Sequence, residues 1–520
     1  MQFLVSAAQM KSYDSNTIEK IGIPALVLME RAAVAVVEEI RRRFPGTVLW
    51  ENGKERKLTV LIVAGCGNNG GDGLAIGRIL GEYGYEVSFV LIGDREKCSR
   101  ETKTQIQILE RMGISIESAL PVQTEETGRK TKGWDIVIDG LFGIGLSRAV
   151  TGIFAQAVEY INRSGAYIVS ADMPSGIHTD TGAVMGTAVR ADLTVTFGYK
   201  KVGQIFYPGT EYTGELVCKR IGISYREGLE SPVAFTYDRA DLAKLPMRRN
   251  DGNKGSFGKV YIIAGSREMY GASRFAVLGA YRTGAGLVRI LTERSNRELL
   301  FSAVPEAIVD TYETEFPEKA LAAGLAWADC VVIGPGIGKG PLACRMMKYV
   351  WERCGVPLIV DADGLNLLAE WPETVAVEKG RLVYFTPHMG EFSRLTKKSI
   401  KCCKEERIST VKEYALAVGA VVVSKDARTV IGSPEGELYI NTSGDNGMAT
   451  GGSGDVLAGI LAGLVAQGMR GMEAACMAVY LHGLTGNAVS EKKSVYSAMA
   501  GDLLEMLPEI FLSKEEGNGE

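Results

Sequence analysis

The 520-residue sequence predicts an α/β protein of two domains, each a parallel β-sheet covered by helices on both faces. Three observations predict this fold class. The chain is too long for one ordinary hydrophobic core. Short apolar runs rich in Val and Ile alternate with helical patterns, as in sheets with crossover helices. A polar segment interrupts this alternation, which then starts afresh. We therefore expect two three-layer α/β sandwiches.

The first series of strands belongs to a domain expected over residues 1–225. Because its apolar runs are continuous rather than alternating, each is expected to be buried on both faces of a sheet. Ahead of them, Ser6 is placed to cap a helix that stops near Gly22, and Pro24 opens a second apolar helix. The predicted strands lie within 58–65, 86–93, 134–143, 166–176 and 193–198.

The second series follows the polar segment 224–231, which has no periodicity. We predict a linker at 226–236, a second domain at 237–512, and a disordered tail at 513–520. Apolar helices are expected from Asp455 and from Met472. The predicted strands of this domain lie within 259–266, 287–292, 329–338, 357–366, 382–391 and 420–429.

Composition excludes several classes of protein. Hydrophobic residues make up 46% and charged residues 23%, as in globular proteins. The formal net charge is −4 with no long block of one sign, so we expect neither a nucleic-acid nor a membrane partner. Nine cysteines without a CxxC pair indicate neither a disulfide framework nor a zinc site. The N-terminus lacks the pattern of a signal peptide, so a cytoplasmic location is expected.

The segment GCGNNGGDG (65–73) follows the first predicted strand and leads into an amphipathic helix. Gly65, Gly67 and Gly70 satisfy GxGxxG. A glycine-rich turn at a helix N-terminus points backbone N–H groups at one spot, which suits a phosphate. The polar residues in this segment are not what the dinucleotide fingerprint requires, so the pattern alone is weak. The alternative is a tight strand-to-helix turn without a ligand.

Two aspartates, Asp139 and Asp172, close apolar strands at the sheet edge where open parallel sheets bind their ligands. Burial of such a carboxylate is costly unless it meets a cation or hydrogen-bond donors. Together with oxygens of Asn69 and Ser175, the aspartates could surround a monovalent cation. The alternative is that each of these residues separately caps a helix.

The motifs NNGGDG, DGLFGIGLSR and SADMPSG, preceded by GIPALVLMERAA, resemble the YjeF N-terminal family of NAD(P)H-hydrate epimerases over about residues 1–225. The resemblance implies a Rossmann-like sandwich, a potassium ion held by Asn69, Asp139 and Ser175, and Asp172 as candidate base at the nicotinamide C6 centre. It also implies that the hydrated dinucleotide is bound by Asn68, Asn69, Gly70, Gly71, Asp72, Gly143, Ile144, Gly145, Leu146, Ser147, Arg148, Ala149 and Asp172.

The most specific stretch of the chain is NTSGDNGMATGGSGDVLAGILAGL (441–464). Gly451, Gly452 and Gly454 leave backbone amides free at the start of a helix, an arrangement that suits an anion hole for a phosphate. Beside them, Asp455 is placed to accept a hydroxyl proton while the oxygen attacks phosphorus. The alternative is that Asp455 only caps its helix.

This stretch resembles the ribokinase-like superfamily and, within it, the YjeF C-terminal family of ADP-dependent NAD(P)H-hydrate dehydratases. The motifs KGSFGKVYIIAGS, GPGIG, DADGLN, TPHMGE and GGSGDVLAGI carry the resemblance over about residues 237–510. It implies a ribokinase-like three-layer sandwich that uses Mg²⁺. It implies that Ala272, Gly336, His388 and Asp455 contact the hydrated nucleotide. The ADP-binding residues would be Lys425, Asp426, Ala427, Arg428, Thr429 and Gly454.

One residue departs from the family pattern, because Asp426 stands where the family usually has glycine. A carboxylate beside the nucleotide is expected to weaken phosphate binding or to alter the preference for ADP over ATP. His388 has an alternative reading as an ordinary loop residue, although its place at a strand end favours a role in the site.

Together the two resemblances imply a bifunctional enzyme. The first domain would interconvert the R and S forms of NADH and NADPH hydrate (NADHX and NADPHX), and the second would dehydrate the S form with ADP, giving AMP and phosphate. We expect a homo-oligomer. Two alternatives remain open: a small-molecule kinase with the same GxGD arrangement, and a dimerising scaffold of the kind found in RNA-associated proteins. The near-neutral charge and the intact NNGGDG motif argue against the scaffold.

Overall fold

The computed structural model describes residues 1–51, 54–121, 133–226, 228–371 and 375–516. The chain forms two compact units, Gln2–Val233 and Ala234–Glu520, with Met1 joined to the second. The end of the predicted linker belongs to the second unit, because Ala234–Thr236 form β11. At the other end, α18 (Ala500–Glu516) continues into the predicted disordered tail, whose last residues lie outside the described part of the chain.

The first unit is built on a parallel sheet with the strand order β10-β8-β7-β6-β4-β5. All five predicted strands are confirmed. The edge strand β10 was not predicted, because its half-exposed residues do not form a continuous buried run. A parallel pair, β1 with β9, and a separate antiparallel hairpin, β2 with β3, complete the strands that the structure describes in this unit. Their bounds are β1 Gln2–Val5, β2 Val48–Glu51, β3 Lys54–Lys57, β4 Thr59–Ala64, β5 Glu86–Leu91, β6 Ile136–Gly140, β7 Tyr167–Ala171, β8 Leu193–Phe197, β9 Lys200–Lys201 and β10 Glu215–Lys219.

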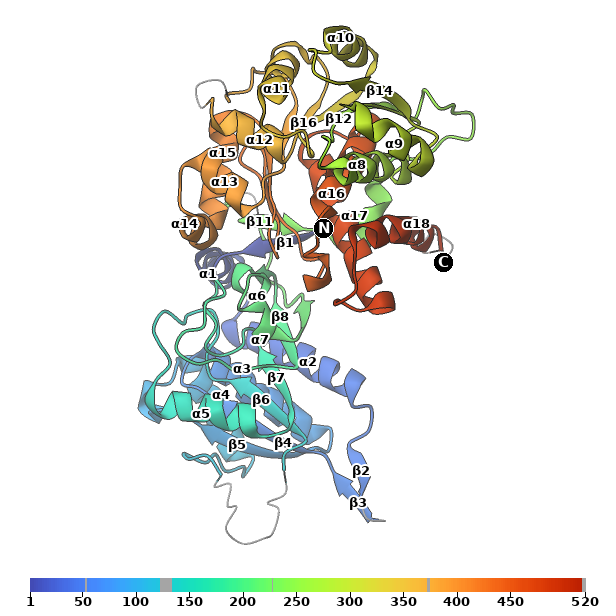
Figure 1. Ribbon diagram of the computed structural model, residues 1–520. Helices are drawn as coiled ribbons and strands as arrows, with labels where there is room; N and C mark the ends of the chain where they lie inside the picture. Colours follow the sequence, from blue (N-terminus) through green and yellow to red (C-terminus); the bar gives the residue numbers. More distant parts are fainter. Residues whose placement is uncertain (52–53, 122–132, 227, 372–374, 517–520) are drawn as a thin grey trace. The chain divides into compact units, whose positions relative to one another are not determined.

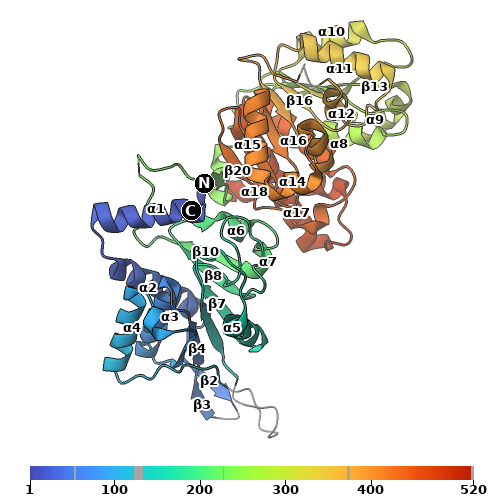
Figure 2. The same ribbon diagram turned by 90° about the vertical axis from the view of Figure 1, so that its left-hand side faces the viewer.

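The three layers of this unit follow from the alternation of side chains along the buried strands. In β4, Val60 and Ile62 pack in one core cluster with α2, α3 and α4, whereas Leu61 and Val63 pack in another with α5. Figure 2 shows these helices on opposite sides of the sheet. The helices are α1 Ala7–Asn16, a π-helical turn Thr17–Ile21, α2 Ala25–Arg43, α3 Asn68–Glu82, a 3₁₀ turn Arg95–Lys97, α4 Arg100–Arg111, α5 Gly152–Arg163, α6 Val202–Ile205 and α7 Thr210–Thr213.

The start of α1 confirms the predicted cap. The Ser6 hydroxyl accepts from the backbone N–H of Gln9, and the Gln9 side chain accepts from the backbone N–H of Ser6, which forms a capping box. Gly22, with φ of +86°, ends the π-helical turn in a conformation that glycine adopts most readily. These local signals were therefore sufficient to place the helix.

The second unit has the strand order β14-β13-β12-β15-β16-β17-β18-β19-β20-β11. The strands from β14 to β18 are parallel, and β19 runs antiparallel to both neighbours. All six predicted strands are confirmed, whereas β14 and the three-residue β19 were not predicted. The bounds not given above are β12 Lys259–Ile263, β13 Leu287–Glu293, β14 Ile308–Tyr312, β15 Cys330–Ile333, β16 Leu358–Val360, β17 Val383–Phe385, β18 Val421–Ser424, β19 Val430–Gly432 and β20 Leu438–Ile440.

Helices cover both faces of this sheet, with α11, α13 and α15 on one side and α8, α16 and α17 on the other (Figure 1). Val260 and Ile262 of β12 share a core cluster with α8 and α16, while Tyr261 between them donates to the Ala320 carbonyl of α10 at 3.2 Å. The helices are α8 Tyr270–Arg282, α9 Arg297–Ala303, α10 Glu318–Trp327, α11 Pro341–Arg353, α12 Asp363–Ala369, α13 Met389–Thr396, α14 Ile400–Glu405, α15 Arg407–Val418, α16 Ser453–Ala466 and α17 Gly471–Lys493. The described 3₁₀ turns lie at Arg239–Lys244, Arg294–Asn296 and Asn446–Met448.

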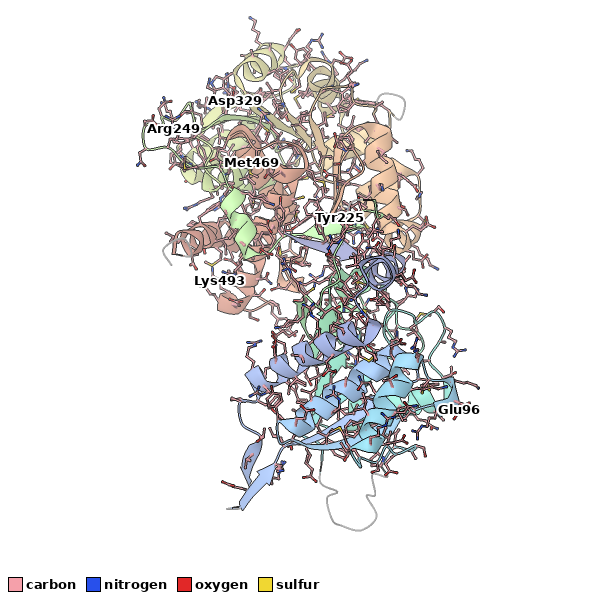
Figure 3. The ribbon with its side chains drawn as sticks, turned by 180° about the vertical axis from the view of Figure 1, so that it is seen from behind. Glu96, Tyr225, Arg249, Asp329, Met469 and Lys493 are labelled. Carbon is pink, nitrogen blue, oxygen red and sulfur yellow. The ribbon has the colours of Figure 1, made fainter. Side chains whose placement is uncertain are left out.

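The amino ends of the strands are tied by structural contacts. Asp329, labelled in Figure 3, precedes β15 and accepts from the backbone N–H of Lys259 at 2.9 Å. The carboxyl ends lead into the glycine-rich loops. This leaves the carboxyl edge of the sheet for ligands, as is usual in open parallel sheets. In the described part of the chain, no helix is long and apolar enough to cross a membrane.

Candidate active sites

The first unit has a cavity of ≈ 590 Å³ at the carboxyl ends of β4, β6 and β7. The strand order reverses at this place, because the chain continues from β4 to β5 on one side and from β6 to β7 on the other. Open parallel sheets bind ligands at such a topological switch point. Most of the predicted dinucleotide-binding residues line it: Asn68, Asn69, Asp72, Gly143, Ile144, Gly145, Leu146, Ser147, Arg148 and Asp172. Gly70, Gly71 and Ala149 are not among its lining residues.

The glycines of the NNGGDG turn serve packing. A Cβ on Gly70 would lie 1.8 Å from the Gly65 carbonyl oxygen, and one on Gly65 would lie 2.1 Å from the Leu141 carbonyl oxygen. Only glycine permits these approaches. They bring the N-terminus of α3, capped by Gly67, onto the cavity wall, where helix dipole and backbone N–H groups favour an anion.

Asp139 is fully buried and is surrounded by neutral donors. Its carboxylate accepts from the Ser175 hydroxyl at 2.5 Å, the Ser175 backbone N–H at 2.8 Å and the Ser170 hydroxyl at 2.8 Å. Burial raises the pKa of Asp139, and these hydrogen bonds oppose the rise. None of these donors carries a positive charge, so the buried carboxylate lacks a compensating cation among them.

Asn69 lies beside this cluster, because a Cβ on Gly143 would come within 3.3 Å of its side-chain oxygen. The Asn69 amide nitrogen is buried and has no hydrogen-bond partner. A carboxylate, a hydroxyl and an amide oxygen are hard oxygen donors, and a cation here would compensate the Asp139 charge. The residues predicted to hold potassium therefore fit a monovalent cation in their chemistry.

Asp172 forms a second buried charge cluster. It adopts a left-handed backbone conformation with φ of +62°, which is strained for a residue other than glycine. Its Oδ1 accepts from the Lys201 ammonium at 2.5 Å, the Thr196 hydroxyl at 3.0 Å and the Phe197 backbone N–H at 3.0 Å. Lys201 is 0% exposed. A buried lysine thus holds the Asp172 carboxylate in place.

Two more carboxylates line the same cavity, Asp14 of α1 and Asp72 of α3. Burial raises the pKa of Asp72 well above its ordinary value, and the negative charges of Asp172 and Asp14 raise it further. Burial and the charge of Asp172 also raise the pKa of Asp14. Both groups therefore hold a proton more firmly than a free aspartate.

Sequence reasoning missed Asp14 and Lys201. Each is a single charged residue outside the glycine-rich motifs, and only the tertiary fold brings α1 and β9 beside Asp172. The one available signal is that Lys201 lies three residues after the apolar run 193–198, and this position does not reveal burial.

The second unit has a cavity of ≈ 390 Å³ near the carboxyl ends of β12, β15 and β16. It too lies at a switch point, because the chain builds β13 and β14 on one side of β12 and then β15 on the other. Of the predicted residues, Ala272, Gly336 and Asp455 line it. Gly451 and Gly452, two of the three glycines predicted to form an anion hole, line it as well. Sequence reasoning did not assign the other lining residues as ligands: Met269, Gly271, Phe275, Ala362 and Asp363.

The helix behind this cavity begins without a side-chain cap. Gly452, with φ of +92°, is the N-cap of α16, and a Cβ there would lie 2.6 Å from the Phe275 ring. Asp455 is the third residue of the helix and is not its N-cap. The N-terminal end of the helix, at Gly452, and Asp455 thus share one cavity wall, which suits a phosphate beside a base.

Asp455 has a pKa raised to about 7, first by burial and then by the charge of Asp361. Lys425 opposes this rise. The Lys425 ammonium pairs with Asp361 at 2.8 Å, and a Cβ on Gly454 would lie 3.3 Å from the lysine nitrogen. Lys425 and Gly454, both predicted to bind ADP, therefore meet at the start of α16, next to a carboxylate poised to accept a proton near neutral pH.

His388 is not among the residues that line this cavity, and its side chain is 58% exposed. It begins α13, where its Nδ1 accepts from the Gly390 backbone N–H at 2.9 Å and its Nε2 contacts Glu391 at 3.2 Å. The imidazole thus caps a helix in the described structure, beside the loop that carries Lys425, whose N–H donates to the Pro387 carbonyl.

The rest of the predicted nucleotide loop follows β18. The Asp426 carboxylate pairs with the Arg407 guanidinium of α15 at 2.9 Å, a partner that no sequence motif indicates. The Thr429 hydroxyl donates to the Asp426 carbonyl at 3.4 Å, which closes the loop. The loop is thereby held by its own side chains.

Within the described ranges, no cluster of three or more His, Cys, Asp or Glu residues is arranged to hold a metal ion. Mg²⁺ in phosphoryl-transfer sites is bound mainly by phosphate oxygens and one or two carboxylates. Asp363 offers one carboxylate on the cavity wall, where its other contact is the Gly338 backbone N–H at 2.9 Å. This donor set fits a magnesium ion that arrives with a nucleotide.

Comparison with known proteins matches both units. The family model for the YjeF-related protein N-terminus matches residues 25–203, and that for NAD(P)H-hydrate dehydratase matches residues 260–509. The chain is 36% identical to the bifunctional NAD(P)H-hydrate repair enzyme Nnr of Thermofilum pendens, covering 98% of this chain and 96% of that one. The enzyme of the same name from Escherichia coli is 32% identical over 96% of this chain and 92% of that one.

Among solved structures, a ribokinase-like superfamily protein from Enterococcus faecalis is 30% identical with a TM-score of 0.50, covering 56% of this chain and 99% of that one. An ADP/ATP-dependent NAD(P)H-hydrate dehydratase from Bacillus subtilis, co-crystallised with ATP and Mg²⁺, is 27% identical with a TM-score of 0.48, covering 54% of this chain and 99% of that one.

Proposed function

The chain belongs to the family of bifunctional NAD(P)H-hydrate repair enzymes, and we propose on that premise that its units catalyse two steps of one repair. The first unit interconverts the R and S forms of NADH and NADPH hydrate. The second dehydrates the S form with ADP and releases AMP and phosphate. The observation that carries the proposal is Asp455, a proton acceptor with a pKa of about 7 beside an uncapped helix N-terminus.

In the second unit, Asp455 accepts the proton of the C6 hydroxyl as its oxygen attacks the β-phosphorus of ADP. A C6–O–P bond forms, the bond from phosphorus to the bridging oxygen breaks, and AMP leaves. The amides at the start of α16 and the Lys425 ammonium stabilise the transferring phosphoryl group. Loss of a proton from C5 and of phosphate from C6 then restores the dihydronicotinamide. Bound Mg²⁺ would supply charge neutralisation at the phosphates.

The pH dependence of dehydration follows from Asp455. Since its pKa is about 7 and only the ionised form accepts a proton, kcat/KM for the hydrate should rise with pH up to about 7 and level off above it. Asp361→Asn removes a negative charge next to Asp455, so the rising part of the kcat/KM profile should move to lower pH. Initial rates, followed by reduced-nicotinamide absorbance between about pH 5.5 and 8.5, measure this dependence.

If the rising part of the kcat/KM profile stays at the same pH in the Asp361→Asn variant, Asp455 is not the group that titrates. The ionisation of ADP itself also affects the rate, but it does not shift when a protein residue is changed. The variant therefore separates the enzyme's group from the substrate's.

In the first unit, Asp172 is the proposed base. The hydrated C6 is bonded to both a ring nitrogen and a hydroxyl, so removal of the hydroxyl proton allows the C6–N1 bond to break, with its electron pair going to N1. Asp72 or Asp14, whose raised pKa values favour the protonated form, supplies the proton to N1. Ring closure on the opposite face reverses these transfers and gives the other epimer.

Lys201 is expected to matter because it is the buried cation beside Asp172. Lys201→Met should slow epimerisation at pH 7 by at least about tenfold, because Asp172 loses the buried ammonium group that holds its carboxylate in position. Chromatographic separation of the two epimers over time measures the rate. Lys200→Met is the matched control. An unchanged rate at pH 7 for Lys201→Met would rule out this role.

The experiment that tests the whole proposal is incubation of the protein with hydrated NADH and either ADP or ATP. Return of the reduced-nicotinamide absorbance is expected, with release of AMP when ADP is the donor. A small-molecule kinase would leave the hydrate unchanged with every nucleotide.

Finer points of the proposal remain predictions. Potassium at Asn69, Asp139 and Ser175 would compensate the buried carboxylate and orient Asn69, and replacement of K⁺ by Li⁺ should then slow epimerisation. Binding of the dehydration substrates to the predicted residues, a homo-oligomeric state and a cytoplasmic location also stand as predictions. Sedimentation analysis tests the oligomeric state.

A further inference from the structure

Lys425 and Asp426 leave the end of β18 in opposite directions. The Lys425 ammonium reaches Asp361 at 2.8 Å, next to Gly454 at the start of α16. The Asp426 carboxylate reaches the Arg407 guanidinium at 2.9 Å, on α15. Successive side chains of an extended segment point to opposite faces, which accounts for the divergence. The loop therefore presents a cation to the phosphate position and turns its carboxylate away.

Arg407 is buried, with 7% of its surface exposed, and it spans the carboxylate and the backbone of the same loop. Besides its bond to Asp426, its second terminal nitrogen donates to the Ser424 carbonyl at 2.9 Å. Burial lowers the pKa of Arg407 to about 10, and the Asp426 charge opposes this fall. The guanidinium is therefore charged at neutral pH and neutralises Asp426 where it stands.

We propose that Arg407 is a positioning residue for the nucleotide loop Lys425–Thr429, which lets that loop bind the phosphates of an adenine nucleotide although it carries a carboxylate. The proposal rests on the proposed function of this loop. It replaces the expectation that Asp426 weakens phosphate binding, since that expectation considered Asp426 without a partner.

The proposal predicts that loss of Arg407 and loss of the Asp426 charge have different effects on ADP binding. Loss of Arg407 leaves the Asp426 carboxylate with the exposed and more distant Lys404 ammonium, at 4.0 Å, as a weaker partner. Its negative charge then opposes the nearby phosphates, and such like-charge repulsion near a protein surface costs about a factor of ten in affinity. Loss of the Asp426 charge leaves a cation near the phosphates, which does not oppose binding. A purely structural pair would make both losses harmful.

The test measures ADP binding by calorimetry, and KM and kcat for dehydration, in the full chain. Arg407→Gln is expected to raise Kd and KM for ADP about tenfold with kcat within about twofold, and the defect should shrink as salt increases. Asp426→Gly, and the double variant with Arg407→Gln, should bind ADP within about threefold of the unchanged protein. Arg289→Gln is the matched control, because Arg289 pairs with Asp310 in the same unit away from the loop.

Failure of Asp426→Gly to rescue Arg407→Gln would overturn the proposal, as would a loss of affinity in Asp426→Gly equal to that in Arg407→Gln. If Arg407→Gln does not fold, Asp426→Asn decides, because it removes the charge and keeps the size of the side chain. A loss of affinity smaller than about fivefold supports the proposal, and a larger loss overturns it. Absence of any ADP or ATP binding by the unchanged protein overturns the proposed function itself.

Discussion

Asp455→Asn is expected to slow ADP-dependent dehydration by about a thousandfold, while epimerisation by the first unit continues at its normal rate. The amide cannot accept the hydroxyl proton at any pH, and loss of a general base in a preorganised site costs on the order of 10² to 10⁴ in rate. Single-turnover measurement of reduced-nicotinamide absorbance from the S epimer gives the rate of dehydration. Chromatographic separation of the epimers over time gives the rate of epimerisation.

The same substitution should stabilise the protein above neutral pH. The folded-state pKa of Asp455, about 7, lies above its ordinary value of 3.8, so the folded protein loses stability as pH rises through this interval and the carboxyl ionises. An amide does not ionise and avoids this loss. The gain at pH 8 is on the order of 2 kcal/mol after allowance for partial exposure, or a few degrees in Tm, and it should vanish at pH 4.

A matched control is Asp502→Asn. Asp502 also lies in the first turn of a helix, α18, but it pairs with Lys493, labelled in Figure 3, outside the cavity lining. Its replacement should leave dehydration unchanged. Residual dehydration above about one-tenth in Asp455→Asn would show that another group is the base.

Asp172→Asn is expected to reduce epimerisation by about a hundredfold or more and to leave dehydration of the S epimer intact. The variant loses the proposed base. It also leaves the fully buried Lys201 without its ionic partner, which costs about 3 to 5 kcal/mol in buried pairs. Epimer chromatography measures the rate, and thermal unfolding measures the stability of the variant.

The double variant Asp172→Asn with Lys201→Met separates catalysis from stability. Removal of both charges should recover much of the lost stability but none of the epimerisation. Asp135→Asn is the control, since Asp135 pairs with Arg56 at 2.6 Å at the amino ends of the strands. Normal epimerisation in the double variant would mean that Asp172 serves the fold alone.

Much of the fold could be predicted because its signals are local. Continuous apolar runs mark buried parallel strands, and the Ser6 capping box and Gly22 mark the ends of the first helix within a few residues. The missed strands β10, β14 and β19 lack such runs. Half-exposed edge strands and three-residue strands are set by their neighbours in the sheet, and that information is not local.

Sequence patterns were sufficient to predict two α/β units, and the motifs identified the glycine-rich turns, Asp139, Asp172 and Asp455 as candidate site residues. Only the tertiary structure showed that Asp14 and Lys201 join Asp172, that Lys425 turns toward Asp361, and that Arg407 neutralises Asp426. The reason is physical. Backbone turns depend on a few adjacent residues, whereas the charge state of a buried carboxylate depends on groups that the fold brings from distant parts of the chain.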